Sequence, residues 1–182
     1  FYCQRLYREI SQRLAESGQE DLLKTLEMPL AAVLADMETV GFRIDRDGIA
    51  HYGEQLSVVA SQLEAQIYFH AGKEFNVNSP KQLGEVLFDT LGLPHAKKTK
   101  TGYSTNAEIL EKLRPAHPII DDILDYRQVT KLKSTYTDGL LKVADENGRV
   151  HTTFKQTGTA TGRLSSTEPN LQNIPVRTEL GR

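Results

Sequence analysis

Residues 118–143 read PIIDDILDYRQVTKLKSTYTDGLLKV, and this stretch decides the fold because its apolar residues recur at helical spacing. At about 100° per residue, Arg127, Lys131 and Ser134 fall within about 60° of one another. The spacing therefore predicts one long helix that packs with one face and presents cations on the other. A cationic face of this kind is typical either of a solvated surface or of a phosphate-binding one. The predicted packing face carries Val129, Leu132, Tyr136 and Leu140.

Helices are also predicted on the N-terminal side of this stretch. Ser79-Pro80-Lys81-Gln82 is typical of a helix start, because Ser can accept from the N3 amide, Pro fits the first position and Gln can reach back to the Ser amide. Thr105-Asn106-Ala107-Glu108 repeats this capping pattern and begins a short helix that ends at Leu113. Earlier segments predict a long amphipathic helix that ends near Gly72, a helix from Met28 to Gly41, and two short helices over residues 2–26.

Few strands are expected. Phe42-Arg43-Ile44-Asp45 alternates briefly like a strand, but residues 150–154, which are β-prone after the Asn147-Gly148 turn, are the only place where a strand is predicted. Residues 157–182 are rich in Gly, Thr, Ser, Pro and Asn, so we expect an extended, loop-like segment. The fold class is therefore mainly α, a helical subdomain followed by a few short β-strands that begin an α+β unit.

A basic loop is predicted between Leu93 and Ser104, where the sequence has no apolar period. Its lysines, Lys97, Lys98 and Lys100, together with the N-termini of the capped helices beside it, are groups that bind phosphates. Thr99 and Thr101 lie in the same loop.

Composition bounds the function classes. The chain has 182 residues, a formal net charge of −2 and no run near the roughly 18 consecutive apolar residues of a membrane-spanning helix. The balance of charge argues against a uniformly basic nucleic-acid binder, and the arrangement of charge on one face has to decide instead. The lone Cys3 fits a reducing cytoplasm, and a start at Phe1 without an initiator Met reads as the interior of a longer chain.

Acidic pairs and histidines are the candidate metal ligands, and neither set has suitable spacing. Asp36 and Glu38 are two apart on a helix and point about 200° away from each other, so a structural role is favoured. Asp121 and Asp122 occupy a first helical turn, where negative charge is favoured without any catalytic reason. We expect no metal site. The five histidines are scattered, at His51, His70, His95, His117 and His151.

The most informative segment is residues 159–175, which read TATGRLSSTEPNLQNIP. Arg163 follows a glycine, and the amides and hydroxyls around it are hydrogen-bonding groups without a neighbouring catalytic carboxylate. Such a loop suits binding to an electron-rich partner better than proton abstraction, and a structured polar loop is the alternative. As a string, however, it closely resembles the motif that begins the palm of the DNA polymerase I family, called family A.

The resemblance to family A extends over most of the chain. It includes Met28-Pro29-Leu30, Asn78 to Leu83, the Lys97 loop and the run from Tyr126 to Tyr136. It implies that residues 1–27 end a preceding exonuclease-like domain or form a linker, and that residues 28–45 connect at the base of the palm. Residues 46–143 are then the thumb, and residues 144–182 are the first part of the palm.

The resemblance also implies roles for individual residues. Arg163 is expected to reach the minor groove at the primer terminus, with Asn170 and Gln172 beside it, and Arg177 is expected near the incoming nucleotide. One Arg can test pairing geometry without reading sequence, because purine N3 and pyrimidine O2 are acceptors in every base pair. The phosphates would be held by the basic loop and by Asn78, Ser79, Gln82, Arg127, Lys131 and Ser134.

The implied parent is a bacterial DNA-directed DNA polymerase of replication and repair, which uses deoxynucleoside triphosphates and Mg²⁺. We expect it to be a cytoplasmic, nucleoid-associated monomer without a membrane partner. The family's catalytic aspartate motifs are absent from these 182 residues, so this piece alone is expected to be inactive and to hold no metal. A stand-alone DNA-binding module is the alternative function, and a helical interaction protein is a third.

Overall fold

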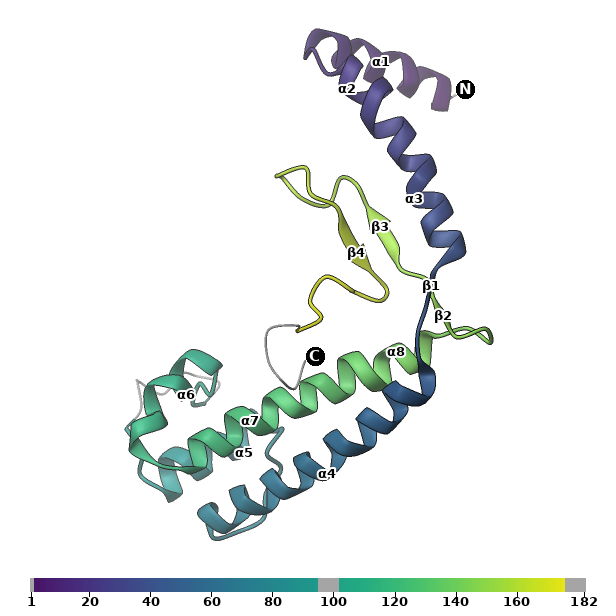
Figure 1. The fold of residues 1–182 in the computed structure, drawn as a ribbon. Helices are drawn as coiled ribbons and strands as arrows, with labels where there is room; N and C mark the ends of the chain where they lie inside the picture. Colours follow the sequence, from purple (N-terminus) through teal and green to yellow (C-terminus); the bar gives the residue numbers. More distant parts are fainter. Residues whose placement is uncertain (1, 95–101, 176–182) are drawn as a thin grey trace. The chain divides into compact units, whose positions relative to one another are not determined.

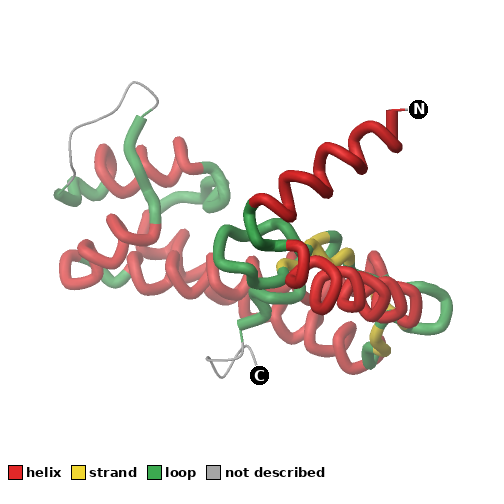
Figure 2. Tube along the Cα trace, turned by 90° about the horizontal axis from the view of Figure 1, so that it is seen from above, coloured by secondary structure: helices red, strands yellow, loops and turns green. Residues whose placement is uncertain are grey.

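The computed structural model describes residues 2–94 and 102–175 and divides the chain into two compact units. Asp45–Lys142 form the bulk of one, called here the helical unit; residues 2–44 and 143–174 form the other, called the mixed unit. Most of the described chain is helical (Figures 1 and 2), and its four strands form two two-stranded sheets. The expected class, mainly α with a few short strands, is confirmed. None of the described helices is long and apolar enough to span a membrane.

Two long helices form the axis of the helical unit and lie side by side (Figure 1). The first is α4, Arg46–Ala71, which begins where the Asp45 carboxylate accepts from the Gly48 amide at 3.0 Å. It ends at Gly72, whose φ of 69° is readily adopted by glycine. The second is the predicted long helix, which runs without a break through α7 (Ile119–Lys131), a π-helical segment η4 (Leu132–Thr137) and α8 (Asp138–Val143).

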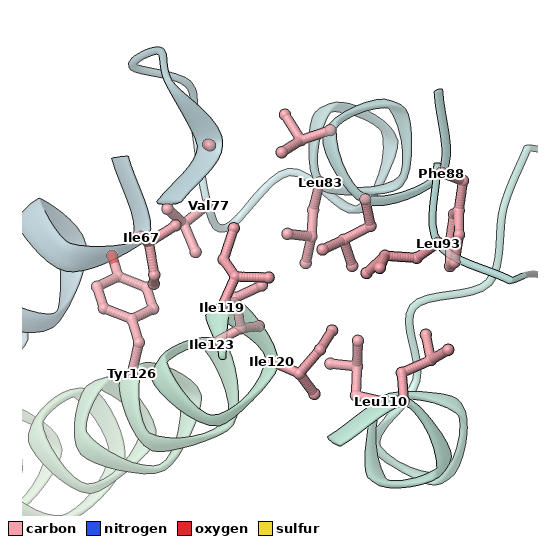
Figure 3. Close-up of a cluster of buried hydrophobic side chains, with 14 residues drawn as sticks. Ile67, Val77, Leu83, Phe88, Leu93, Leu110, Ile119, Ile120, Ile123 and Tyr126 are labelled. Carbon is pink, nitrogen blue, oxygen red and sulfur yellow. The ribbon is translucent and has the colours of Figure 1, made fainter. Parts of the chain in front are cut away.

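The main core lies at one end of these helices, where shorter helices close over α7. They are α5 (Pro80–Gly84), which continues as η2 (Glu85–Thr90), and α6 (Ala107–Leu113) with a 3-10 turn η3 (Arg114–Ala116). Figure 3 shows Ile119, Ile120 and Ile123 of α7 among the side chains of these neighbours, and all three are fully buried. Each such side chain contributes about 1.5–3 kcal/mol by leaving water. The predicted packing face of the helix lies outside this main core. Val129 and Leu132 form a smaller cluster with Leu56 of α4, Tyr136 packs against that cluster, and Leu140 is buried elsewhere along the helix.

The two predicted capping boxes form only in part. Ser79 does cap α5, since its hydroxyl accepts from the Gln82 amide at 3.4 Å, but the Gln82 side chain accepts from the Asn76 amide instead of reaching back to Ser79. At α6 the prediction of Thr105 as the cap was wrong. Asn106 caps this helix and accepts from the Ile109 amide at 2.9 Å, because Thr105 is buried and bonded elsewhere.

The helices of the mixed unit confirm the break predicted at Ser17-Gly18. They are α1 (Tyr2–Glu16), α2 (Glu20–Leu22), the π-helical η1 (Leu23–Glu27) and α3 (Met28–Val40), which stops at Gly41. Although α3 begins at Met28 as predicted, Pro29 does not follow a loop. It follows a π-helical turn, which leaves the chain helical from Glu20 onwards.

The strands differ from the prediction in how they are divided. β1 (Phe42–Arg43) pairs antiparallel with β2 (Arg149–Val150), whereas β3 (Thr153–Lys155) pairs with β4 (Ser165–Thr167). The single β-prone run at 150–154 is thus split between two sheets. The buried Thr152 hydroxyl, which donates to the carbonyls of Thr167 and Pro169, lies at the division. β4 lies in the segment that was expected to be loop-like, so that expectation was wrong for residues 165–167.

Candidate nucleic-acid interface

The polar face of α7 brings together two cations in different environments. The Arg127 guanidinium donates to the Thr105 carbonyl at 2.5 Å and to the Thr105 hydroxyl at 3.2 Å. Burial lowers the pKa of Arg127, which still stays charged at neutral pH. Lys131 is exposed, and among the described residues none contacts its ammonium group. Lys131 is therefore available to a phosphate, whereas Arg127 is already joined to the start of α6.

Ser134 and the turn before α5 complete the candidate phosphate ligands of the helical unit. Ser134 is exposed one turn beyond Lys131, and its hydroxyl donates to the Lys131 carbonyl at 3.5 Å. The Asn78 amide side chain donates to the Tyr126 hydroxyl at 3.1 Å, which attaches the turn to α7. Ser79 and Gln82 are occupied in capping contacts within the same turn. The structure thus places Asn78 next to α7, but it does so through Tyr126.

Tyr126 is a residue that the sequence analysis did not select. Its ring belongs to the core, and its hydroxyl is the partner of Asn78. A tyrosine on the packing face of a helix signals such a contact, since a buried phenolic hydroxyl usually finds a hydrogen-bond partner. The remaining predicted ligands, Lys97, Lys98, Thr99, Lys100 and Thr101, lie outside the described residues, as does Arg177.

Arg163 lies in the loop between β3 and β4 of the mixed unit. Its side chain is exposed, and its carbonyl accepts from the Thr159 hydroxyl at 2.8 Å. Gly162 before it has a φ of 73° that disfavours other residues, and a Cβ added at Gly158 would lie 2.7 Å from the Ser165 hydroxyl. The Thr159 hydroxyl therefore supports the loop backbone at Arg163, and Arg163 itself is exposed.

Gln172 and Asn170 lie on the segment that returns past this loop. The Gln172 amide nitrogen donates to the Leu164 carbonyl at 2.8 Å, and its oxygen accepts from the Ser166 amide at 3.3 Å. The Asn170 oxygen accepts from the Gln172 backbone amide at 3.0 Å. The structure thus brings Gln172 into contact with Leu164, the residue after Arg163. The nitrogen and the oxygen of the Gln172 side-chain amide are both occupied by these contacts.

Several of the described acidic side chains make structural contacts. The Glu38 carboxylate accepts from the Phe154 amide at 2.6 Å, which agrees with a structural role for Glu38, whereas Asp36 is exposed. Asp122 lies 3.4 Å from a His70 ring nitrogen, and burial raises the pKa of this carboxyl, with Asp125 and Asp121 adding to the rise and His70 opposing it. Over residues 2–94 and 102–175, His, Cys, Asp and Glu form no group of three that could hold a metal ion.

Comparisons with known proteins define the class. The sequence profile of DNA polymerase family A matches residues 46–182, so the chain belongs to DNA polymerase family A. The resemblance inferred from the TGRLSS motif is confirmed.

Individual relatives narrow the likeness to DNA polymerase I. The chain is 53% identical over 180 residues to DNA polymerase I of Bacillus subtilis (strain 168), covering 98% of this chain and 20% of that protein. It is 49% identical over 178 residues to DNA polymerase I of Treponema pallidum (strain Nichols), covering 98% of this chain and 18% of that protein. The chain therefore spans about a fifth of the length of these curated relatives.

A solved structure shares the fold. The POL domain of Pol1 from M. smegmatis, in complex with a DNA primer-template and dNTP, has a TM-score of 0.85 and 46% sequence identity to this chain. The likeness covers 94% of this chain and 30% of that one.

Proposed function

We propose that this chain is the part of a DNA-directed DNA polymerase that binds the primer-template duplex through its phosphates and its minor groove. The observation that carries the proposal is the exposed Arg163, whose backbone carbonyl accepts a hydrogen bond from Thr159 within the same loop. A guanidinium presented in this way suits the minor-groove acceptors N3 and O2, which every base pair shares. The likeness to a POL domain solved with primer-template and dNTP supports this role.

In this proposal the helical unit supplies the thumb of the polymerase and the mixed unit supplies the first part of the palm, while residues 1–27 belong to a preceding domain or linker. Lys131 and Ser134 would contact phosphates directly, together with the predicted ligands of residues 97–101. Asn78, Ser79 and Gln82 would shape the turn that faces the duplex, and Asn170 and Gln172 would support Arg163. Arg177 would lie near the incoming nucleotide.

The complete polymerase would use Mg²⁺ and deoxynucleoside triphosphates in replication and repair. Paired metal ions stabilise the charge that develops during phosphoryl transfer. No group of described residues fits such a pair, so the metal-binding carboxylates would be supplied by other parts of the enzyme. We further propose a monomer that works in the bacterial cytoplasm, associated with the nucleoid.

The test is duplex binding by the 182-residue chain at several salt concentrations. We expect weak binding that does not depend on sequence and that falls as salt rises, because phosphate contacts release counterions. Fluorescence anisotropy with several random duplexes measures both features. An affinity that stays constant between low and moderate salt would show that the surface does not bind phosphates.

A further inference from the structure

Glu38, in the last turn of α3, contacts β3 and the segment that precedes it. Its carboxylate oxygen accepts from the Phe154 backbone amide at 2.6 Å, and its own carbonyl oxygen lies 2.8 Å from Nδ1 of His151. Asp36, two positions earlier, lines a cavity of about 320 Å³, and among the described residues its carboxylate has no hydrogen-bond partner. Two neighbouring carboxylates on one helix therefore differ sharply, and only Glu38 holds a strand.

The contact at Phe154 gives a hydrogen-bond partner to a backbone amide at the edge of the two-stranded sheet of β3 and β4. β3 has a single partner strand, β4, and Phe154 pairs in register with Ser166. An edge strand leaves backbone donors without a partner in the sheet, and a buried donor without a partner costs free energy. The Glu38 carboxylate supplies that partner, and the charge of the acceptor makes the bond stronger than a neutral one.

Other side chains join the same two segments on either side of Glu38. The Arg149 guanidinium donates to the carbonyls of Val40 and Gly41 at 3.0 and 3.2 Å. The Gln156 amide donates to the carbonyl and the carboxylate of Glu27 at 3.1 and 2.9 Å. Residues 149–156 are therefore attached along the helix that contains η1 and α3, and Figure 1 shows β3 beside α3.

This attachment reaches Arg163 through the hairpin. Lys155 of β3 pairs with Ser165 of β4, and Arg163 lies two residues before Ser165 in the connecting loop. The Thr159 hydroxyl fixes the Arg163 backbone within that loop. A shift of β3 relative to α3 would therefore displace the guanidinium, and displacements of about 1 Å are costly at a reacting site.

We propose that Glu38 is a positioning residue, whose carboxylate holds β3 against α3 and thereby sets the place of Arg163 in the active site. The inference rests on the proposed function in one respect, namely that Arg163 contacts the primer terminus. Glu38 itself touches neither substrate nor metal in this scheme.

The first measurement tests the attachment itself, in the 182-residue chain and without DNA. Hydrogen exchange of the Phe154 amide is expected to become about tenfold faster or more in Glu38→Ala, because the donor loses a charged acceptor. Glu38→Gln keeps an acceptor oxygen and should restore most of the protection. Asp36→Ala is the matched control and should leave the exchange unchanged. Unchanged exchange in Glu38→Ala would overturn the inference and leave the proposed function intact.

The second measurement tests the route through Arg163, in the complete polymerase that contains this chain. Glu38→Ala is expected to slow single-turnover extension of a matched primer by about tenfold, and Glu38→Gln by about twofold. In an Arg163→Ala background, Glu38→Ala should add no further loss, because the group that it positions is gone. If the rate loss in the double variant equalled the product of the two single losses, the inference would be overturned. A normal rate in Arg163→Ala alone would overturn the proposed role of Arg163, and with it this inference, while the amide exchange reports separately on the attachment.

Discussion

Arg127 and Lys131 are one helical turn apart on α7, yet their side chains meet different partners. Arg127 joins α7 to Thr105, which is 22 positions earlier in the chain, through two hydrogen bonds from one guanidinium. A planar fork can make both bonds at once, and a lysine ammonium cannot reproduce that geometry. Lys131 offers the same charge without such a partner. Arg127 is therefore a structural cation, and Lys131 is the one that we propose to bind a phosphate.

We predict opposite outcomes for conservative changes at these two positions. Arg127→Lys keeps the charge but loses the fork, and it should destabilise the chain by about 1.5 kcal/mol, close to the loss in Arg127→Gln. Lys131→Gln should leave stability unchanged and reduce the salt slope of duplex binding by about 1. Thermal unfolding and anisotropy titrations measure these effects. If Arg127→Lys were as stable as the parent chain, the hydrogen bonds from Arg127 to Thr105 would contribute nothing to stability.

The sequence could predict the angular position of Arg127 but not its partner. Angles along a helix follow from the helical repeat, so the cationic face was available from spacing alone. The Thr105 carbonyl and hydroxyl come close to Arg127 only because α6 packs against α7, which no local pattern encodes. For the same reason Thr105 could not be recognised as a buried acceptor, and it was taken for a helix cap.

At the scale of elements, the carboxyl groups of Asp122 and Asp145 have pKa values that are shifted in opposite directions. Asp122, in the first turn of α7, has a raised pKa, chiefly because burial disfavours its charged form. Asp145, in the turn before β2, has a lowered pKa, chiefly because the Arg149 amide donates to its carboxylate at 2.6 Å. The charge of Asp122 is therefore unfavourable at the start of α7, whereas the charge of Asp145 stabilises the turn before β2.

The pH dependence of stability should have opposite signs for these two groups. Because the folded pKa of Asp122 lies above its ordinary value of 3.8, its ionisation costs stability, and the cost grows as pH rises through the folded pKa. For Asp145 the folded pKa lies below 3.8, so its contribution is present above that pH and is lost on acidification. Asp122→Asn should therefore be more stable than the parent chain at higher pH, and this advantage should shrink as pH falls. Asp145→Asn should be less stable than the parent chain at higher pH, and this deficit should shrink as pH falls. Carboxyl titrations by NMR, with unfolding measured between about pH 3 and pH 6, check both signs.

Two C-terminal helix ends were predicted well, and the division of strands was not. Gly41 and Gly72 stop their helices as expected, because the left-handed or extended conformations at these ends are local preferences of glycine. The β-prone run at 150–154 gave no sign that β2 and β3 belong to different sheets, since β1 lies more than 100 positions earlier. Pairing over that separation is determined by packing. The formation of β4, which begins in the TGRLSS motif, is determined by packing as well.

At the scale of the whole chain, buried apolar residues are concentrated in the helical unit. Within the described residues, the mixed unit buries Leu34 and Val150, whereas Val33, Met37 and Val40 of its helix α3 remain more than half or about half exposed. We therefore expect hydrogen bonds such as that from Phe154 to Glu38 to matter more there than in the helical unit, which contains the larger core. The family motif thus lies in the unit with the smaller core.

The last prediction is that the 182-residue chain binds primer-template duplex but incorporates no nucleotide. Binding needs cations at the surface, and we propose that the exposed Lys131 and Arg163 supply them. Incorporation needs paired metal ions held by carboxylates that face the reacting phosphate. Glu38 and Asp145 accept hydrogen bonds from the backbone, and Asp122 contacts His70, so these carboxyl groups are engaged in structure. Gel analysis of a labelled primer, with template, Mg²⁺ and all four deoxynucleotides, should show no extension, while the complete polymerase extends the same primer. Extension by the rigorously purified chain would mean that its own carboxylates assemble a metal site when DNA is bound, and it would reverse the proposed division of labour between this chain and other parts of the enzyme.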